Sequence, residues 1–75
     1  MENKEDIVKT TSWFSFGQQH IHNVNNVIFD KDSIVEITAE DPRQVMFDTF
    51  KNKWGFEYKE KPDIYHFPRG IIKLQ

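Results

Sequence analysis

Apolar and polar residues alternate with a period of two near the start of the chain, a pattern typical of a β-strand with one buried face. The segment is residues 11–16, TSWFSF. Phe14 and Phe16 fall on one face of such a strand, and Trp13 falls on the other. Gly17 follows and ends or bends the strand. We therefore predict a first strand whose two phenylalanines contribute to the core.

Two further apolar segments, residues 24–29 and 34–39, are separated by the turn-forming sequence Asp-Lys-Asp-Ser. In the second of them Val35 and Ile37 alternate with polar residues, which predicts one buried and one solvated face. Two strands joined by a short polar turn form a hairpin. We expect these two strands to pair with each other in an antiparallel arrangement.

The clearest helix start is the sequence Glu-Asp-Pro-Arg at residues 40–43. Asp41 is a favourable N-cap, and Pro42 suits the first helical position because its missing N–H has no partner there. We predict a helix from Pro42 to Asn52. Its apolar face should lie on the sheet and present the side chains of Met46, Phe47, Phe50 and Trp54.

Residues 54–59, WGFEYK, return to a period of two. Trp54, Phe56 and Tyr58 share one face, and we expect Trp54 and Phe56 to be core residues. A Lys-Pro-Asp sequence interrupts this strand. After an irregular Phe-Pro-Arg-Gly segment, residues 71–74 supply one more short strand.

The expected order of elements is β-β-β-α-β, with a further β at the end, which defines an α+β fold. We predict a small antiparallel sheet with one helix packed on one face. A length of 75 residues is that of one domain. We interpret the charged residues 1–10 as a flexible polar N-terminal segment and residues 11–75 as a single α+β domain.

Composition excludes several classes of protein. The chain has no cysteine, so neither disulfides nor a cysteine zinc site stabilise it. The charged N-terminus does not resemble a signal peptide. No apolar run approaches the roughly 18 residues that span a bilayer. We therefore expect a cytoplasmic protein that does not contact a membrane.

Charge is distributed unevenly along the chain. Residues 11–50 carry six acidic and two basic residues, a net charge of −4, whereas residues 51–75 carry six basic and three acidic residues, a net charge of +3. The acidic middle argues against binding of duplex nucleic acid, which depends on neutralising phosphates. The basic C-terminal third is compatible with a smaller anionic ligand.

The segment FGQQHIH, residues 16–22, holds two of the three histidines. In an extended backbone, Gln18, His20 and His22 point the same way. A His-x-His pair supplies two metal ligands and His66 could supply a third, but no acidic residue lies nearby in the sequence. The ordinary interpretation is a polar strand end, and a metal site on His20, His22 and His66 is the alternative.

A catalytic role is not indicated by the sequence. Either histidine of this segment could act as a general base, but no nucleophile accompanies it. The chain has no cysteine, no serine in an elbow motif and no pair of acids at a hydrolase spacing, and Gly17 alone is not a phosphate loop. We predict a protein that is not an enzyme and has no cofactor.

Binding of a partner is the chemistry that the sequence supports better. The glutamines and histidines of residues 18–22 are rotatable donors and acceptors. Arg69 lies in a Pro-Arg-Gly turn that could present its guanidinium to an anion, and Tyr65 could stack on a base or fill a pocket. We predict one contiguous binding surface, which requires both segments to meet at one edge of the sheet. It comprises Gln18, Gln19, His20, His22, Tyr65, His66 and Arg69.

Two ordered motifs in the chain resemble those of a known family. They read F-x-F-G-Q-x-H-x-H at residues 14–22 and W-x-F-x-Y at residues 54–58. They are similar to the opening and ending motifs of a group of small uncharacterised proteins carried by bacteriophages and prophages. The resemblance covers residues 12–58. The chain departs from the family at residues 43–46, which read Arg-Gln-Val-Met where Ala-Arg is usual.

This resemblance implies a biological setting and no known reaction. Small proteins of mobile elements often bind a host component, including proteins of antiviral defence. We therefore expect a non-enzymatic binder or inhibitor of a host protein, or a binder of a small anionic ligand. A metal-binding protein and a structural or assembly protein that forms a homo-oligomer are the alternatives. An open sheet edge would also allow a homodimer.

Overall fold

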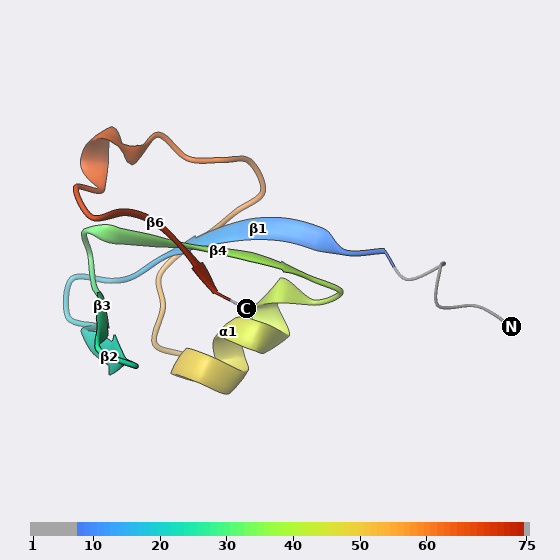
Figure 1. Cartoon of the computed structure of the whole chain (residues 1–75), viewed down its shortest axis with the longest axis horizontal. Helices are drawn as coiled ribbons and strands as arrows, with labels where there is room; N and C mark the ends of the chain where they lie inside the picture. The colour runs from blue at the N-terminus through green and yellow to red at the C-terminus, as the bar shows by residue number, and fades with distance from the viewer. Residues whose placement is uncertain (1–7, 75) are drawn as a thin grey trace, which may run out of the picture.

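Four strands form the main sheet, in the order β5-β1-β4-β6 (Figure 1). The computed structural model describes residues 8–74. β1 (Thr10–Ser15) pairs antiparallel with β4 (Ser33–Ala39) on one side and with β5 (Glu57–Tyr58) on the other. β6 (Gly70–Leu74) pairs parallel with β4 and forms the far edge. The sheet is therefore mixed.

The α+β class and the single helix on one face are confirmed, but the sheet is not wholly antiparallel. α1 (Pro42–Phe50) lies below the sheet in Figure 1, and the segment between β5 and β6 passes above it. That segment includes the short 3₁₀ helix η2 (Ile64–His66). Parallel strands need such a long crossover connection. Because the chain crosses before it returns, β6 runs in the same direction as β4.

The segment that was expected to be one strand, residues 24–29, instead contains the turn of a small hairpin. β2 (His22–Val24) and β3 (Val27–Phe29) pair antiparallel across Asn25 and Asn26. Both asparagines have a positive φ, 53° and 68°, as in the two-residue turns that suit twisted hairpins. The expected pairing of this segment with the next strand is wrong, because β1 lies beside β4.

Helix α1 begins where the sequence predicts. The Asp41 carboxylate accepts a hydrogen bond from the Gln44 N–H at 3.3 Å, and Pro42 is the first helical residue. The helix ends at Phe50, slightly before its expected end. Lys51 takes a positive φ of 61°, which terminates the helical backbone.

The core lies between α1 and the inner face of the sheet. Phe14 and Phe16 are buried, as predicted. Met46 and Phe50 of the helix are buried in the same cluster, whereas Phe47 is 53% exposed. Phe47 lies about 100° further round the helix than Met46, which turns it away from the sheet. The buried apolar cluster comprises Phe14, Phe16, Phe29, Val35, Ile37, Met46 and Phe50.

Of the strand predicted at residues 54–59, only Glu57 and Tyr58 form a strand, β5, and the predicted buried face is wrong. Trp54 is half-buried, with its ring 5.0 Å from that of Phe14. Phe56, which was expected in the core, is 71% exposed. Glu57 takes the inward position opposite Phe14, and its side chain is only 7% exposed.

Glu57 tolerates this position because two cations neutralise it. Arg43 Nε and Lys59 Nζ both donate to its carboxylate, the latter at 2.9 Å. Burial acts to raise the pKa of Glu57, but the hydrogen bonds from Lys59 and Arg43 outweigh burial and hold that pKa below its ordinary value. Phe56 and Tyr58, on either side of Glu57, consequently point away from the face of the sheet that carries Glu57.

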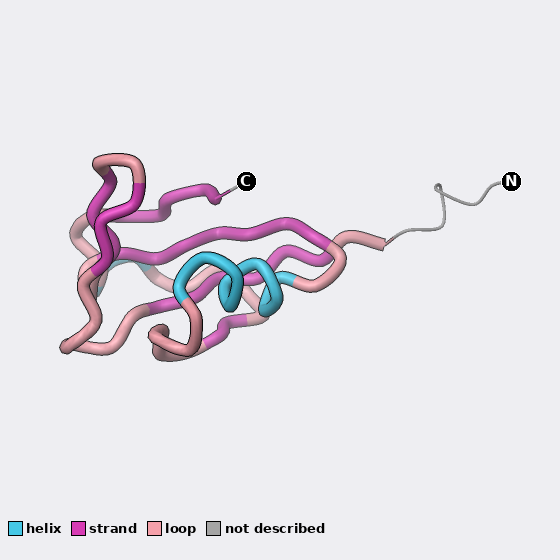
Figure 2. Tube along the Cα trace, turned by 90° about the horizontal axis from the view of Figure 1, so that it is seen from below, coloured by secondary structure: helices cyan, strands magenta, loops and turns pink. Residues whose placement is uncertain are grey.

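Seen from below, α1 lies across one face of the sheet and the β2–β3 hairpin lies at one end (Figure 2). Residues 71–74, predicted as a strand, are confirmed within β6. The flexible segment expected at residues 1–10 lies mostly outside the described residues, and β1 already includes Thr10. β1 ends at the same end of the sheet where β4 and β6 begin.

Candidate functional site

His22 begins β2 and packs against the edge of the core. Its ring centroid lies 5.6 Å from that of Phe16 and 5.0 Å from that of Phe50. Its Nε2 donates a hydrogen bond of 3.0 Å to the carbonyl of Lys53, just after α1. A carbonyl only accepts, so this bond places a proton on Nε2. His22 thereby ties the hairpin to the end of the helix.

The residues before His22 form a tight turn. The His20 N–H donates to the Gly17 carbonyl at 3.0 Å, and Gln18 and Gln19 are exposed within this turn. The half-buried His20 ring stacks on His22, with centroids 6.4 Å apart. The same ring covers Gly17, where an added Cβ would lie 3.1 Å from it. Of the predicted binding residues here, Gln18 and Gln19 have the exposed side chains.

The two stacked histidines do not belong to a three-ligand metal site. Among residues 8–74, no three His, Cys, Asp or Glu side chains are grouped so that they could hold a metal ion. His66, the expected third ligand, lies in η2 and contacts Tyr65. Structural and catalytic zinc sites use three or four protein ligands. The pair by itself gives no support to the metal-binding alternative.

Tyr65 and His66 lie on the η2 turn at the surface. Tyr65 is 80% exposed and Ile64 is 48% exposed, and the Tyr65 and His66 rings meet edge to face with centroids 5.1 Å apart. The Asp63 carboxylate accepts from the Tyr65 N–H at 2.9 Å, and the Ile64 carbonyl accepts from the Phe67 N–H at 2.9 Å. A hydrogen-bonded backbone therefore carries exposed aromatic and aliphatic side chains.

Arg69 is held against the turn between β3 and β4. Its N–H donates to the Asp32 carbonyl at 2.9 Å, and its Nε donates to the Asp30 carboxylate at 3.1 Å. Burial acts to raise the pKa of Asp30, but the Asp32 N–H and the Arg69 guanidinium outweigh burial and hold that pKa below its ordinary value. The Arg69 guanidinium is thus already shared with an acid of the same chain and only partly available to a ligand.

The structure places the two predicted segments at the same end of the sheet but does not join them. η2 lies above the sheet in Figure 1, whereas the loop after β1 and the hairpin lie below it. Within the described part of the chain, no hydrogen bond or ring contact connects residues 18–22 with residues 64–69. The predicted residues therefore form two separate groups.

The residues that position the η2 group were not among the predicted site residues. Asp63 caps the turn, and Asp30 holds Arg69. Asp63 had a local signal, because an aspartate after a proline often accepts from the N–H two residues later. Asp30 had none, because its partner lies 39 residues away in the sequence. The exposure of Ile64 and Phe56 was missed as well, since apolar residues in a short segment do not reveal which face is covered.

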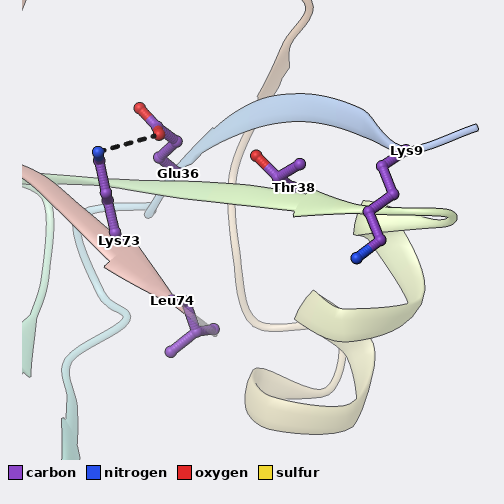
Figure 3. A pocket seen from close by; sticks show the side chains of 5 residues that line it. All are labelled: Lys9, Glu36, Thr38, Lys73 and Leu74. Atoms are coloured by element: carbon purple, nitrogen blue, oxygen red, sulfur yellow. Dashed lines mark ion pairs between the residues drawn. The ribbon is translucent and has the colours of Figure 1, made fainter.

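An open groove lies at the far end of β6. It has a volume of about 500 Å³ and is lined by Lys9, Glu36, Thr38, Lys73 and Leu74 (Figure 3). Within it, Lys73 Nζ lies 3.9 Å from Glu36 Oε2, and the other carboxylate oxygen, Oε1, accepts from Trp13 Nε1 at 3.0 Å. None of the predicted binding residues lines this groove. Among residues 8–74, β6 pairs with β4 only as far as Ile37, a pairing that was not predicted from the sequence.

Comparison of the chain with known protein families, with curated proteins and with solved structures finds no match. Within residues 8–74, no helix combines the length and the apolar content needed to cross a bilayer. The functional interpretation therefore depends on the geometry of the two groups described above.

Proposed function

We propose that this protein is a non-enzymatic binding protein of the bacteriophage or prophage type, which binds a host protein in the cytoplasm. We name its contact region the η2 surface and define it as Ile64, Tyr65, His66 and Arg69. The observation that carries the proposal is the 80% exposure of Tyr65 on a hydrogen-bonded turn. Inhibition of a host defence protein is the form of binding that the resemblance to phage proteins implies.

An exposed tyrosine on an ordered backbone suits a protein interface. Tyrosine contributes a large contact area with only two rotatable side-chain bonds, so that binding costs little conformational entropy. The backbone of η2 is already held by the hydrogen bonds to Asp63 and Ile64. A partner would therefore bury the apolar area of Tyr65 and Ile64 without first having to order the loop.

A protein partner fits the η2 surface better than a small anionic ligand does. The Nε of Arg69 already donates to Asp30, which reduces its attraction for a free anion. The adjacent exposed apolar side chains of Ile64 and Tyr65 instead favour an apolar pocket on a partner. A non-enzymatic role is consistent with His22, whose ring is engaged by Phe50 and by the Lys53 carbonyl.

Quantitative affinity purification from a bacterial host lysate, followed by measurement of Kd for the purified partner, tests this proposal. The wild-type protein is compared with Tyr65→Ala and with Phe47→Ala, which removes another exposed ring from α1. We expect Tyr65→Ala to raise Kd at least about tenfold, or about 1.4 kcal/mol. Phe47→Ala should leave Kd unchanged, and neither variant should lower the melting temperature.

Equal Kd values for the three proteins would refute the η2 surface. The double variant Gln18→Ala/Gln19→Ala tests the other predicted segment, because both side chains are exposed and can be removed without disturbing the core. Binding that depends on these glutamines and not on Tyr65 would move the contact region to the loop after β1.

A further inference from the structure

The two edges of the main sheet differ in their protection against another strand. β5 forms one edge over two residues, Glu57 and Tyr58, and the chain then continues through charged residues to Pro62. β6 forms the other edge over Gly70–Leu74, with Lys73 as its one charged residue and no proline. Sheet edges are normally protected by short strands, prolines or charges. The edge of β6 has the least of these protections.

The outer edge of β6 offers main-chain groups for pairing. Its inner edge is paired with β4 along its whole length, and alternate residues of a strand direct their N–H and C=O groups to each side. Within residues 8–74 no strand lies on its outer side, and β6 is the outermost strand there in Figure 2. Ile71, Ile72 and Leu74 are half-buried, so part of their apolar surface is open to a neighbouring strand.

We propose that the outer edge of β6 pairs antiparallel with the same edge of a second copy of this chain. The two four-stranded sheets then form one sheet of eight strands around a two-fold axis at Ile72. In this register Gly70 lies opposite Leu74 of the second copy. Ile71 lies opposite Lys73 of the second copy, and the two Ile72 residues meet at the axis. This contact is independent of the η2 surface.

Side-chain chemistry selects this register. Residues opposite each other in an antiparallel pair point to the same face of the sheet, whereas neighbouring residues of one strand point to opposite faces. The two-fold axis can therefore lie at a residue but not between two residues. An axis at Lys73 would place two lysines directly opposite each other. An axis at Ile71 would place Lys73 opposite Arg69, another unfavourable pair of like charges. The axis at Ile72 avoids both contacts and places all five residues opposite the second copy. The Gly70 N–H already donates to the Phe67 carbonyl at 2.8 Å, so the free main-chain groups are those of the remaining outward residues.

The proposed pairs are complementary in size and charge. On the inner face, Gly70 leaves space for the larger Leu74 of the second copy. On the outer face, the aliphatic stem of Lys73 can cover Ile71 of the second copy while its ammonium stays near Glu36, which lies 3.9 Å away in the same chain. The Gly70–Leu74 and Ile71–Lys73 pairs each occur twice because of the two-fold symmetry, and the Ile72 pair on the axis occurs once.

The expected dimer is weak and reversible. Specific stable interfaces bury about 1,200–2,000 Å² in total, and pairing of two five-residue strands buries less than that. We therefore expect a monomer–dimer equilibrium that depends on protein concentration rather than a permanent dimer.

Sedimentation velocity over a wide range of protein concentration, with two substitutions at one position, tests the proposal. Ile71→Lys places a lysine opposite Lys73 of the second copy and should raise the dimer Kd at least about tenfold, whereas Ile71→Glu should lower it because a carboxylate then faces that lysine. Both substitutions remove the same apolar contact with Ile34, the residue paired with Ile71 on β4. Changes in opposite directions therefore cannot come from lost packing.

A wild-type protein that stays monomeric, or variants whose Kd moves in the same direction, would overturn the proposal. Amide hydrogen exchange of the wild type provides a readout that needs no variant. Protection of Gly70–Leu74 should increase with protein concentration, while protection of Glu57 and Tyr58 on the opposite edge should not. Protection of β6 that is independent of concentration, or that appears only when another protein is added, would also overturn it.

Discussion

The two histidine-containing segments of the predicted binding surface have opposite structural roles. His22 contacts the buried rings of Phe16 and Phe50, whereas His66 contacts Tyr65, which is 80% exposed. Each segment places a histidine beside aromatic rings, but the rings beside His22 include buried ones and its Nε2 also donates to the Lys53 carbonyl, whereas the ring beside His66 is exposed. A histidine beside aromatic residues therefore indicates a binding surface only when those aromatic residues are themselves exposed.

The difference arises from what each segment follows in the chain. Residues 18–22 come directly after Phe16, which belongs to the core, so the loop turns around a buried ring. Residues 64–66 lie in the crossover between β5 and β6, and none of them is buried. In the first segment His22 is therefore packed against the core, whereas none of the side chains of residues 64–66 is buried.

Removal of a core ring beneath the first segment should have the largest effect. Phe50→Ala deletes a ring whose centroid lies 5.1 Å from Phe16, 5.2 Å from Phe29 and 5.0 Å from His22. We expect the free energy of unfolding, measured by urea denaturation, to fall by about 3–5 kcal/mol. The exposed Phe47 is the control, and Phe47→Ala should change the free energy of unfolding by less than about 0.5 kcal/mol. Similar losses at both positions would contradict the assigned core.

Substitution of each histidine tests the comparison directly. His22→Ala removes three ring contacts and the hydrogen bond to the Lys53 carbonyl, and should reduce the free energy of unfolding by about 1–2 kcal/mol. His66→Ala removes only an exposed contact with Tyr65 and should change it by less than about 0.5 kcal/mol. Thermal and urea denaturation of the two variants provide the measurement. A larger loss for His66→Ala would reverse the assignment of the two segments.

The smallest effect is expected from acidification of the ion pair that anchors the second segment. The pKa of Asp30 is lower in the folded protein than its ordinary value of 3.8. Its pairing with Arg69 therefore stabilises the fold fully above that ordinary pKa, and this stabilisation is lost as pH falls through the lower, folded-state pKa. The pair is partly exposed to solvent, so its contribution is small.

Asp30→Asn should consequently have a lower free energy of unfolding than the wild type near neutral pH. This difference between the two proteins should disappear in strong acid. Urea denaturation of both proteins from neutral pH to about pH 2 measures the difference. The Glu57 carboxyl also has a lowered pKa, but it is present in both proteins and its contribution cancels. A difference that does not vary with pH would show that the pairing with Arg69 does not stabilise the fold.

Sequence patterns predicted the fold best where one short segment contained the whole signal. Asp41 and Pro42 marked the start of α1, and the alternation around Phe14 marked β1. The hairpin turn at Asn25 and Asn26 also had a local signal, because asparagine tolerates a positive φ. The apolar residues on both sides nevertheless suggested one continuous strand, and so the turn was missed.

The candidate site was predictable only as a set of polar and aromatic residues outside regular strands. The exposure of Gln18, Gln19 and Tyr65 agrees with that expectation. The packing of the half-buried His22 against core rings and the outward position of Phe56 do not follow from their own segments. They depend on Phe50 and on Arg43, which come from the helix and determine which side chains are covered.

The sequence by itself determined the start of the helix, the alternating patterns of β1 and β4 and the α+β class, because each depends on neighbouring residues. The tertiary structure decided that β6 runs parallel to β4, that His22 packs against the core, and that Arg69 is held by Asp30. These features join residues far apart in the chain. They form only when packing of the whole domain compensates the entropy lost in closing the long segments between them.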